Sequence, residues 1–224
     1  TGLTRNLTAG EMLSQIYQIQ KDTKERVSNI IVMGMGEPLD NYEELLRFIK
    51  LVSCEKGIGI SQRNITVSTC GLVDKIRMLA DEKLQITLAI SLHAPNDEIR
   101  RQTMPIANRY TIGEIIQACK YYFDKTGRRI TFEYSMIRGV NDKKEHAKEL
   151  AGRLSGLNCH INLIPLNEVK ERNCYRSTKE DIEKFKTILE KYRKTVTIRR
   201  EMGSDIDAAC GQLRKKFLTK NGRN

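Results

Sequence analysis

The sequence predicts an α/β fold built around a parallel β-sheet, and three observations support this prediction. Six short stretches rich in β-branched and other apolar residues recur along the chain. Segments with apolar residues at helical spacing lie between them, so strands and helices alternate. The strands read as nearly continuous apolar runs, as expected when helices cover both faces of a sheet. Periodicity leaves open whether the sheet is open or curls into part of a barrel.

The predicted elements alternate along most of the chain. Strands are expected at residues 29–35, 64–68, 85–91, 129–135, 159–165 and 196–200. Helical spacing is seen, for example, at residues 45–52, 112–123 and 182–192. The pairs Thr8 with Glu11 and Ser177 with Glu180 predict capping boxes at the start of the first and last helices.

The chain is expected to form a single domain, residues 1–224. Its 224 residues are 39% hydrophobic and include only four prolines, which is typical of a globular protein with a sizeable core. No internal repeat, low-complexity segment or Pro/Gly-rich linker divides it. Ligands bind at the C-terminal ends of the strands in either sheet architecture, so the functional residues are expected in those loops.

Charge and hydropathy narrow the functional class. The 39 basic and 28 acidic residues give a formal net charge of +11, which favours a polyanionic partner such as nucleic acid. Many basic proteins bind no nucleic acid, so charge alone does not decide this point. No run approaches the roughly 18 apolar residues of a membrane helix, and the first residues lack the zones of a signal peptide. We therefore expect a cytoplasmic protein without a membrane partner.

The six cysteines never stand at C-x-x-C spacing, so we expect no metal site built from this chain alone, and mostly free thiols. Structural roles are expected for Cys54, Cys70, Cys119, Cys159 and Cys174. Cys210 differs because it follows a predicted strand and a turn, near Arg199, Arg200 and Arg214. Basic surroundings favour a nucleophilic thiolate. The alternative is a small buried residue that opens a short final helix.

The segment MGMGEPLDN directly follows the first predicted strand. Gly34 and Gly36 permit close backbone approach or a positive φ, and Glu37 places a carboxylate at the strand end. This is not the dinucleotide-binding fingerprint, because Leu39 stands where a third glycine would fall. A carboxylate beside exposed amides suits a ligand with an ammonium and a carboxylate, such as an amino acid. The alternative is an ordinary Gly-Pro turn leading into the helix at Asn41.

Other polar residues stand at equivalent strand ends. They are Ser68, Thr69, Ser91, His93 and Asn167. Together they would bring hydroxyl, imidazole and amide groups to one rim. Each taken alone has a structural alternative, such as a helix cap for serine or asparagine. His146 and His160 are instead expected on a helix surface and in a strand.

Seven segments, taken in order, carry a resemblance to a known family. They are VMGMGEPL, ITVSTCG, AISLHA, MPI, GVND, NLIPLN and GSDIDAACGQL. Over essentially the whole chain the sequence resembles the radical S-adenosylmethionine (SAM) methyltransferases that modify C2 of an adenosine in 23S ribosomal RNA and in transfer RNA. The resemblance implies a partial (β/α)6 barrel of the radical SAM class, with SAM as cofactor and these RNAs as partners.

The resemblance also implies roles for individual residues. Gly36 and Glu37 would hold the amino group of SAM and nearby atoms. The ribose, carboxylate and sulfonium regions would be contacted by Ser68, Ser91, Leu92, His93 and Asn167. Cys210 matches the cysteine that one SAM methylates on sulfur. A second SAM, cleaved reductively, then activates that methyl group for addition to adenine C2.

The sequence departs from the family pattern before residue 5. Family members carry a C-x-x-x-C-x-x-C motif for a [4Fe-4S] cluster shortly before the segment found here at residues 5–11, and this motif is absent. The cysteine that resolves the covalent intermediate and an N-terminal accessory domain are absent as well. We therefore expect a catalytic barrel that is inactive alone. The parent protein is expected to be a monomer that uses an electron donor such as a flavodoxin system.

Alternatives from two functional classes stay open. A sister activity methylates C8 of the same adenosine and confers antibiotic resistance, whereas a non-catalytic barrel would only bind RNA. NLIPLN and GEPL favour the C2 group, and the intact DIDAACGQL segment argues against loss of catalysis. A Schiff-base lyase is disfavoured because no predicted strand carries an obviously buried lysine.

Overall fold

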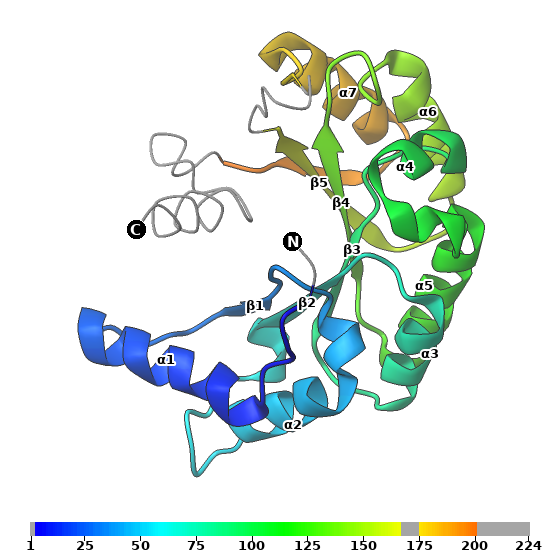
Figure 1. Ribbon diagram of the computed structural model, residues 1–224. Coiled ribbons are helices and arrows are strands. Elements are labelled where there is room, and N and C mark those ends of the chain that lie inside the picture. Colours follow the sequence, from blue (N-terminus) through cyan, green and yellow to red (C-terminus); the bar gives the residue numbers. More distant parts are fainter. Residues whose placement is uncertain (1–2, 167–174, 201–224) are drawn as a thin grey trace. The chain divides into compact units, whose positions relative to one another are not determined.

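The computed structural model describes residues 3–166 and 175–200 (Figure 1). The strands follow the order β1-β2-β3-β4-β5-β6 in one sheet. Their bounds are β1 (Ile30–Val32), β2 (Ile65–Thr69), β3 (Thr87–Ser91), β4 (Ile130–Met136), β5 (Cys159–Pro165) and β6 (Thr195–Ile198). The pairs β1/β2, β2/β3 and β5/β6 are parallel. Each predicted strand is therefore present. Asn167, Cys174 and Cys210 lie outside the described residues.

Helices alternate with these strands, as predicted. The α-helices are α1 (Ala9–Thr23), α2 (Tyr42–Val52), α3 (Val73–Asp81), α4 (Asp97–Thr103), α5 (Ile112–Thr126), α6 (Lys144–Arg153) and α7 (Lys179–Lys191). Short 3-10 helices are η1 (Pro38–Asn41), η2 (Gln62–Asn64) and η3 (Pro105–Asn108). None of the described helices combines the length and apolar character needed to cross a membrane.

The chain divides into two compact units, which we describe separately. Unit 1 comprises Thr1–Ser91 and Arg109–Thr131, and unit 2 comprises Leu92–Asn108 and Phe132–Asn224. The expectation of a single domain over residues 1–224 stays a prediction.

Unit 1 contains the parallel strands β1, β2 and β3. Ile30 lies opposite Ile65, and Thr66 lies opposite Thr87. Helices α3 and α5 pack side by side in this unit (Figure 1). Strand β1 ends at Val32, earlier than the predicted 29–35, because the glycine-containing segment after it leaves the strand pairing. The loop that carries the candidate site therefore begins directly after a short strand.

Unit 2 differs from the sequence-based expectation in how its strands are buried. Strands β4 and β5 alternate between buried and half-exposed residues. Phe132 and Tyr134 of β4 are fully buried, and the Tyr134 ring lies 5.3 Å from the Phe185 ring of α7. Only one face of these strands is fully covered by apolar packing, so the expectation that both faces are buried is wrong for β4 and β5. The less covered face carries polar groups such as Glu133 and Ser135.

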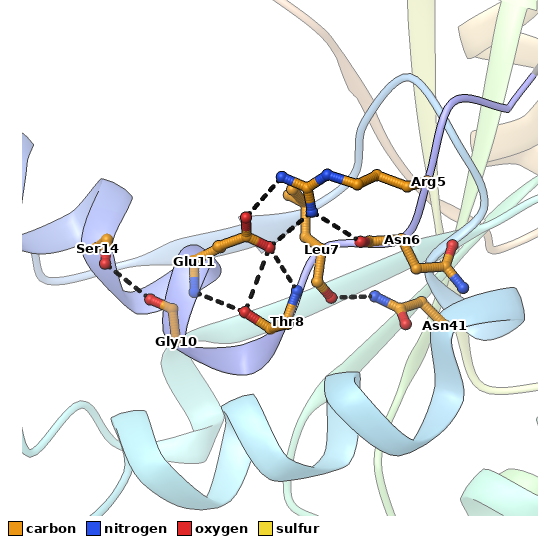
Figure 2. Close-up of polar contacts among 8 residues, drawn as sticks. All are labelled: Arg5, Asn6, Leu7, Thr8, Gly10, Glu11, Ser14 and Asn41. Atoms are coloured by element: carbon orange, nitrogen blue, oxygen red, sulfur yellow. Dashed lines mark hydrogen bonds and ion pairs between the residues drawn. The ribbon is translucent and has the colours of Figure 1, made fainter.

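The predicted capping box at the start of α1 is confirmed (Figure 2). The Glu11 amide donates to Thr8 Oγ1 at 3.2 Å, and the Thr8 amide donates to Glu11 Oε2 at 2.9 Å. Arg5 adds two hydrogen bonds to the same carboxylate, at 2.6 and 2.9 Å. Asn41 Nδ2 donates to the Leu7 carbonyl at 2.8 Å, so this helix start is also fastened to the residues that precede α2.

The second predicted capping box is displaced by one residue. Helix α7 has Thr178 as its N-cap, with the Asp181 amide donating to Thr178 Oγ1 at 3.1 Å. Ser177 instead donates its hydroxyl hydrogen to Asp142 Oδ2 at 2.7 Å. The predicted pairing of Ser177 with Glu180 is therefore wrong, because a contact with a distant loop occupies the serine hydroxyl.

The described cysteines are thiols, and two of them are buried, as expected for structural residues. Cys119 and Cys159 are buried in α5 and β5. Cys54 lies exposed after α2, and Cys70 follows β2.

Candidate functional site

Glu37 connects the ends of two neighbouring strands in unit 1. Its Oε1 accepts from the Leu39 amide at 3.0 Å, which caps η1. Its Oε2 accepts from the Cys70 amide at 2.7 Å. Because Cys70 directly follows β2, the carboxylate joins the loop after β1 to the loop after β2. The expected strand-end carboxylate is therefore present and held in place by backbone donors.

The glycines before Glu37 are exposed and have ordinary backbone angles. Neither Gly34 nor Gly36 has a positive φ, so that part of the expectation is wrong. A Cβ atom built on either glycine would meet no atom of the described residues within 4 Å. Nothing in the described protein requires glycine at these positions, and the space above them is open to a ligand. Close approach of a ligand to the backbone and an ordinary turn both stay open as roles for these glycines.

The ends of β2 and β3 supply hydroxyl groups to unit 1. Ser68 is 6% exposed on β2, and Ser91 is half-exposed as the last residue of β3. Thr69 Oγ1 accepts from the Gly71 amide at 3.1 Å, and Gly71 has a φ of 100° that only glycine adopts easily. Thr69 is thus a turn-forming residue, whereas Ser68 and Ser91 lie at the predicted strand ends.

In unit 2 the turn after β3 is held by main-chain hydrogen bonds. The amides of Leu92 and His93 both donate to the Glu133 carbonyl, at 3.0 and 3.2 Å. Arg100, which is fully buried, donates from Nε to the Leu92 carbonyl at 3.2 Å. His93 has a φ of 57°, a conformation uncommon for a residue other than glycine. The surrounding contacts maintain this strained turn.

Asn141 is the residue that contributes most to this turn. Its fully buried side chain donates from Nδ2 to the His93 carbonyl at 2.8 Å and to the Ser135 carbonyl at 2.7 Å. Its Oδ1 accepts from the Ile137 amide at 2.8 Å. Every hydrogen-bonding group of the amide is used. Sequence reasoning assigned no role to Asn141 or Arg100; the available signal for Asn141 was its place within GVND, one of the segments that carry the family resemblance.

The hydrogen bonds of His93 define its chemistry. The Ser135 amide donates to His93 Nδ1 at 3.0 Å, so Nδ1 is the acceptor and the proton of the neutral ring lies on Nε2. Burial, together with the smaller effect of the Arg100 cation, lowers the pKa of His93 to about 4. The imidazole is therefore neutral at pH 7. It presents an uncharged N–H donor rather than a group poised to exchange protons.

In unit 1, the Glu37 carboxylate and the serine hydroxyls are groups of the kinds that match the ammonium group and the ribose hydroxyls of SAM. In unit 2, the neutral imidazole of His93 is a donor of the kind that matches the carboxylate of SAM. The open space above Gly34 and Gly36 accommodates close approach. Within residues 3–166 and 175–200, no three His, Cys, Asp or Glu side chains gather as metal ligands.

Comparison with known proteins places these features in a family. Residues 5–151 match the Radical SAM superfamily. The chain is 60% identical over 219 residues to the probable dual-specificity RNA methyltransferase RlmN of Lachnoclostridium phytofermentans, covering 98% of this chain and 62% of that protein. It is 61% identical over 217 residues to the protein of the same name from Lachnospira eligens, again covering 62% of that protein. The chain thus spans less than two thirds of the length of these relatives.

Solved structures agree with the fold. A radical SAM methyltransferase from Sphaerobacter thermophilus is 48% identical with a TM-score of 0.89, covering 94% of this chain and 63% of that one. Streptococcus suis SuiB bound to S-adenosylmethionine shares the fold alone, at 16% identity and a TM-score of 0.63, covering 89% of this chain and 45% of that one. The predicted fold, a partial (β/α)6 barrel of the radical SAM class, is confirmed. Because residues 5–151, more than half of its length, match the family model, this chain belongs to the Radical SAM superfamily.

Proposed function

We propose that the chain is the catalytic part of an RNA methyltransferase that methylates C2 of an adenosine in 23S ribosomal RNA and in transfer RNA. The observation that carries this proposal is the 60% identity, over 98% of the chain, to a relative named as a dual-specificity RNA methyltransferase. The motifs that follow the strands and the net charge of +11 support it. We further propose a cytoplasmic monomer that receives electrons from a flavodoxin-type donor.

In unit 1, Gly36 and Glu37 hold the amino group of SAM in this proposal. Each Glu37 oxygen already accepts one backbone hydrogen bond and retains a further lone pair for an ammonium group. The backbone donors keep the carboxylate oriented before the ligand arrives. Ser68 and Ser91 supply hydroxyl groups from the neighbouring strand ends.

In unit 2, His93 contacts the remaining polar groups of SAM in this proposal, and Leu92, which is fully buried with its amide and carbonyl hydrogen-bonded, holds the turn beside it. His93 acts through Nε2–H as an uncharged donor, because Nδ1 is occupied by the Ser135 amide. With a pKa of about 4, the ring binds and orients rather than transfers protons at neutral pH. SAM, when bound together with a [4Fe-4S] cluster, supplies the methyl group and the radical chemistry of the superfamily. Asn167 is proposed to complete the SAM contacts; it lies outside the described residues.

Cys210, also outside the described residues, is proposed as the methyl carrier. Its thiolate accepts a methyl group on sulfur and later delivers the carbon to adenine C2. A carrier is needed because an aromatic C–H carbon has no lone pair with which to displace a methyl group directly.

The proposal is tested by nucleoside analysis with two cysteine variants. The protein as its gene encodes it, loaded with cluster and SAM, is incubated with unmodified RNA and a reductant. Cys210→Ala should abolish 2-methyladenosine, whereas Cys119→Ala, which removes a buried thiol from α5, should retain it and lose only about 1 kcal/mol of stability. Formation of 8-methyladenosine would identify the sister activity. RNA binding without any methylated product from the unaltered protein would identify a non-catalytic barrel.

A further inference from the structure

A basic hollow lies on unit 2, between the loop that follows β4 and the helices α6 and α7. Its volume is about 370 Å³. Its charged lining residues are Arg138, Asp142, Lys143, Lys144, Asp181 and Lys184. The four basic and two acidic side chains give this lining, which we call the loop hollow, a net charge of +2.

The two acids of the loop hollow are occupied by neutral donors. Asp142 accepts from the Gly139 amide at 2.9 Å and from Ser177 Oγ at 2.7 Å. Asp181 accepts from Thr178 Oγ1 at 2.5 Å at the start of α7. Both carboxylates therefore have structural roles in the loop and the helix, and neither forms an ion pair with a lining cation among the described residues.

Most of the cations are available to a ligand. Lys184 pairs with Glu180 at 2.5 Å. Arg138, Lys143 and Lys144 are exposed and have no ion-pair partner within residues 3–166 and 175–200. Phe185 supplies the apolar surface of the lining. Pockets for small molecules are mostly lined by apolar and aromatic side chains, so this composition favours an anionic surface group instead.

The backbone that carries these cations is fixed. The Arg138 amide donates to the Tyr175 carbonyl at 3.0 Å, and Ile137 forms an antiparallel bridge with Arg176. Asn141 accepts from the Ile137 amide at 2.8 Å. A ligand therefore meets a preformed loop and orders only the ends of the side chains, which lowers the entropy cost of binding.

We propose that the loop hollow binds backbone phosphates of the RNA substrate. This inference rests on the proposed function, because it names the part of unit 2 that contacts the RNA. Lysine and arginine contacts to phosphates supply affinity and register without reading sequence, and such contacts release counterions. Open cations beside a strand end suit a flexible polyanion that must bring one base to a site.

The test compares two double variants that remove the same charge. Lys143→Gln with Lys144→Gln empties the loop hollow of two cations, and Lys50→Gln with Lys120→Gln removes two exposed cations from α2 and α5 of unit 1. Binding of an unmodified tRNA transcript to the protein as its gene encodes it is measured over a range of salt concentrations. The hollow variant should reduce the slope of log K against log salt by about one unit per lysine. The unit 1 variant should leave the slope nearly unchanged.

Three results would overturn the inference. Equal slope changes in both double variants would mean that only overall charge matters. Tight binding of inorganic phosphate by calorimetry, with unchanged tRNA binding in the hollow variant, would assign the hollow to a small anion. If tRNA binding is unchanged both in the Lys143→Gln/Lys144→Gln variant and in Arg138→Gln, the loop hollow has no role in RNA binding. A failed methyltransferase proposal is recognised separately, by the absence of methyladenosine from the unaltered protein.

Discussion

The loop after β1 and the turn after β3 are both proposed to contact SAM, yet they are built differently. The loop at Gly34–Glu37 is exposed at its glycines and is held by one carboxylate that accepts two backbone amides. The turn at Leu92 and His93 is packed in unit 2 and held by Asn141, Arg100 and the Glu133 carbonyl. The first leaves space for a ligand, and the second fixes the position of a strained residue.

The comparison teaches that a segment at a strand end can be held either by one of its own side chains or by residues from elsewhere in the same unit. In the β1 loop, the Glu37 carboxylate that is proposed to bind SAM also maintains the geometry of the loop, so few residues are involved. The β3 turn is held in place by residues outside the turn, namely Asn141 and Arg100. The residue proposed to contact SAM, His93, therefore does not have to maintain the turn with its own side chain alone. We therefore expect substitutions to affect stability mainly at the turn and ligand binding mainly at the loop.

The largest effect on stability is expected at Asn141. Asn141→Ala leaves the His93 and Ser135 carbonyls and the Ile137 amide without their partner, at a cost of about 3 to 5 kcal/mol. Denaturant unfolding measures this loss. Asn141→Asp keeps the acceptor for Ile137 and should recover only part of the stability. If both variants unfold like the unaltered protein, the turn does not depend on Asn141.

The next effect is a pH dependence that originates at His93. Its folded-state pKa of about 4 lies below the usual value of 6.5, so the unfolded chain binds the proton more readily. The free energy of unfolding should be constant above about pH 6.5 and fall by on the order of 3 kcal/mol as the pH falls towards 4. His93→Asn, which tolerates the positive φ, should flatten this slope in the same pH range. Equal slopes in the two proteins would contradict the assignment.

A substitution at Glu37 should change the affinity for SAM more than the free energy of unfolding. Glu37→Gln retains one side-chain oxygen acceptor for the amides of Leu39 and Cys70 and loses the negative charge, costing about 1 to 2 kcal/mol. Affinity for SAM should fall more than tenfold in cluster-loaded protein, because the ammonium group loses its charged partner. Calorimetric titration measures this. Asp40→Asn, which removes an exposed charge from the same segment, serves as control and should bind normally.

The smallest effect on stability is expected at Gly36. Its φ is ordinary and an added Cβ meets no atom of the described residues within 4 Å, so Gly36→Ala should be neutral or stabilising by up to about 1 kcal/mol. SAM binding should nevertheless weaken, because the methyl group occupies the space left for the ligand. Thermal unfolding and SAM titration of one sample give both quantities. Unimpaired SAM binding would show that the ligand does not approach this backbone.

Features that depend on residues close together in the sequence were predicted correctly. The alternation of strands and helices follows from apolar spacing, and the Thr8–Glu11 capping box depends on residues three apart. The strand-end positions of Glu37, Ser68, Ser91 and His93 followed from the strand boundaries. One prediction failed because a distant contact intervened: Ser177 bonds to Asp142, which leaves the capping role to Thr178.

The sequence by itself therefore determined the fold class, the order of the elements and which residues stand at the strand ends, because local spacing and caps encode these. Only the tertiary structure decided how the site is held. Asn141 reaches His93 across 48 residues, and Glu37 reaches Cys70 across 33. The depressed pKa of His93 likewise arises from burial and from Arg100, which folding brings against the ring. Such contacts join segments whose separation has no periodic signature, so they form only when packing brings these segments together.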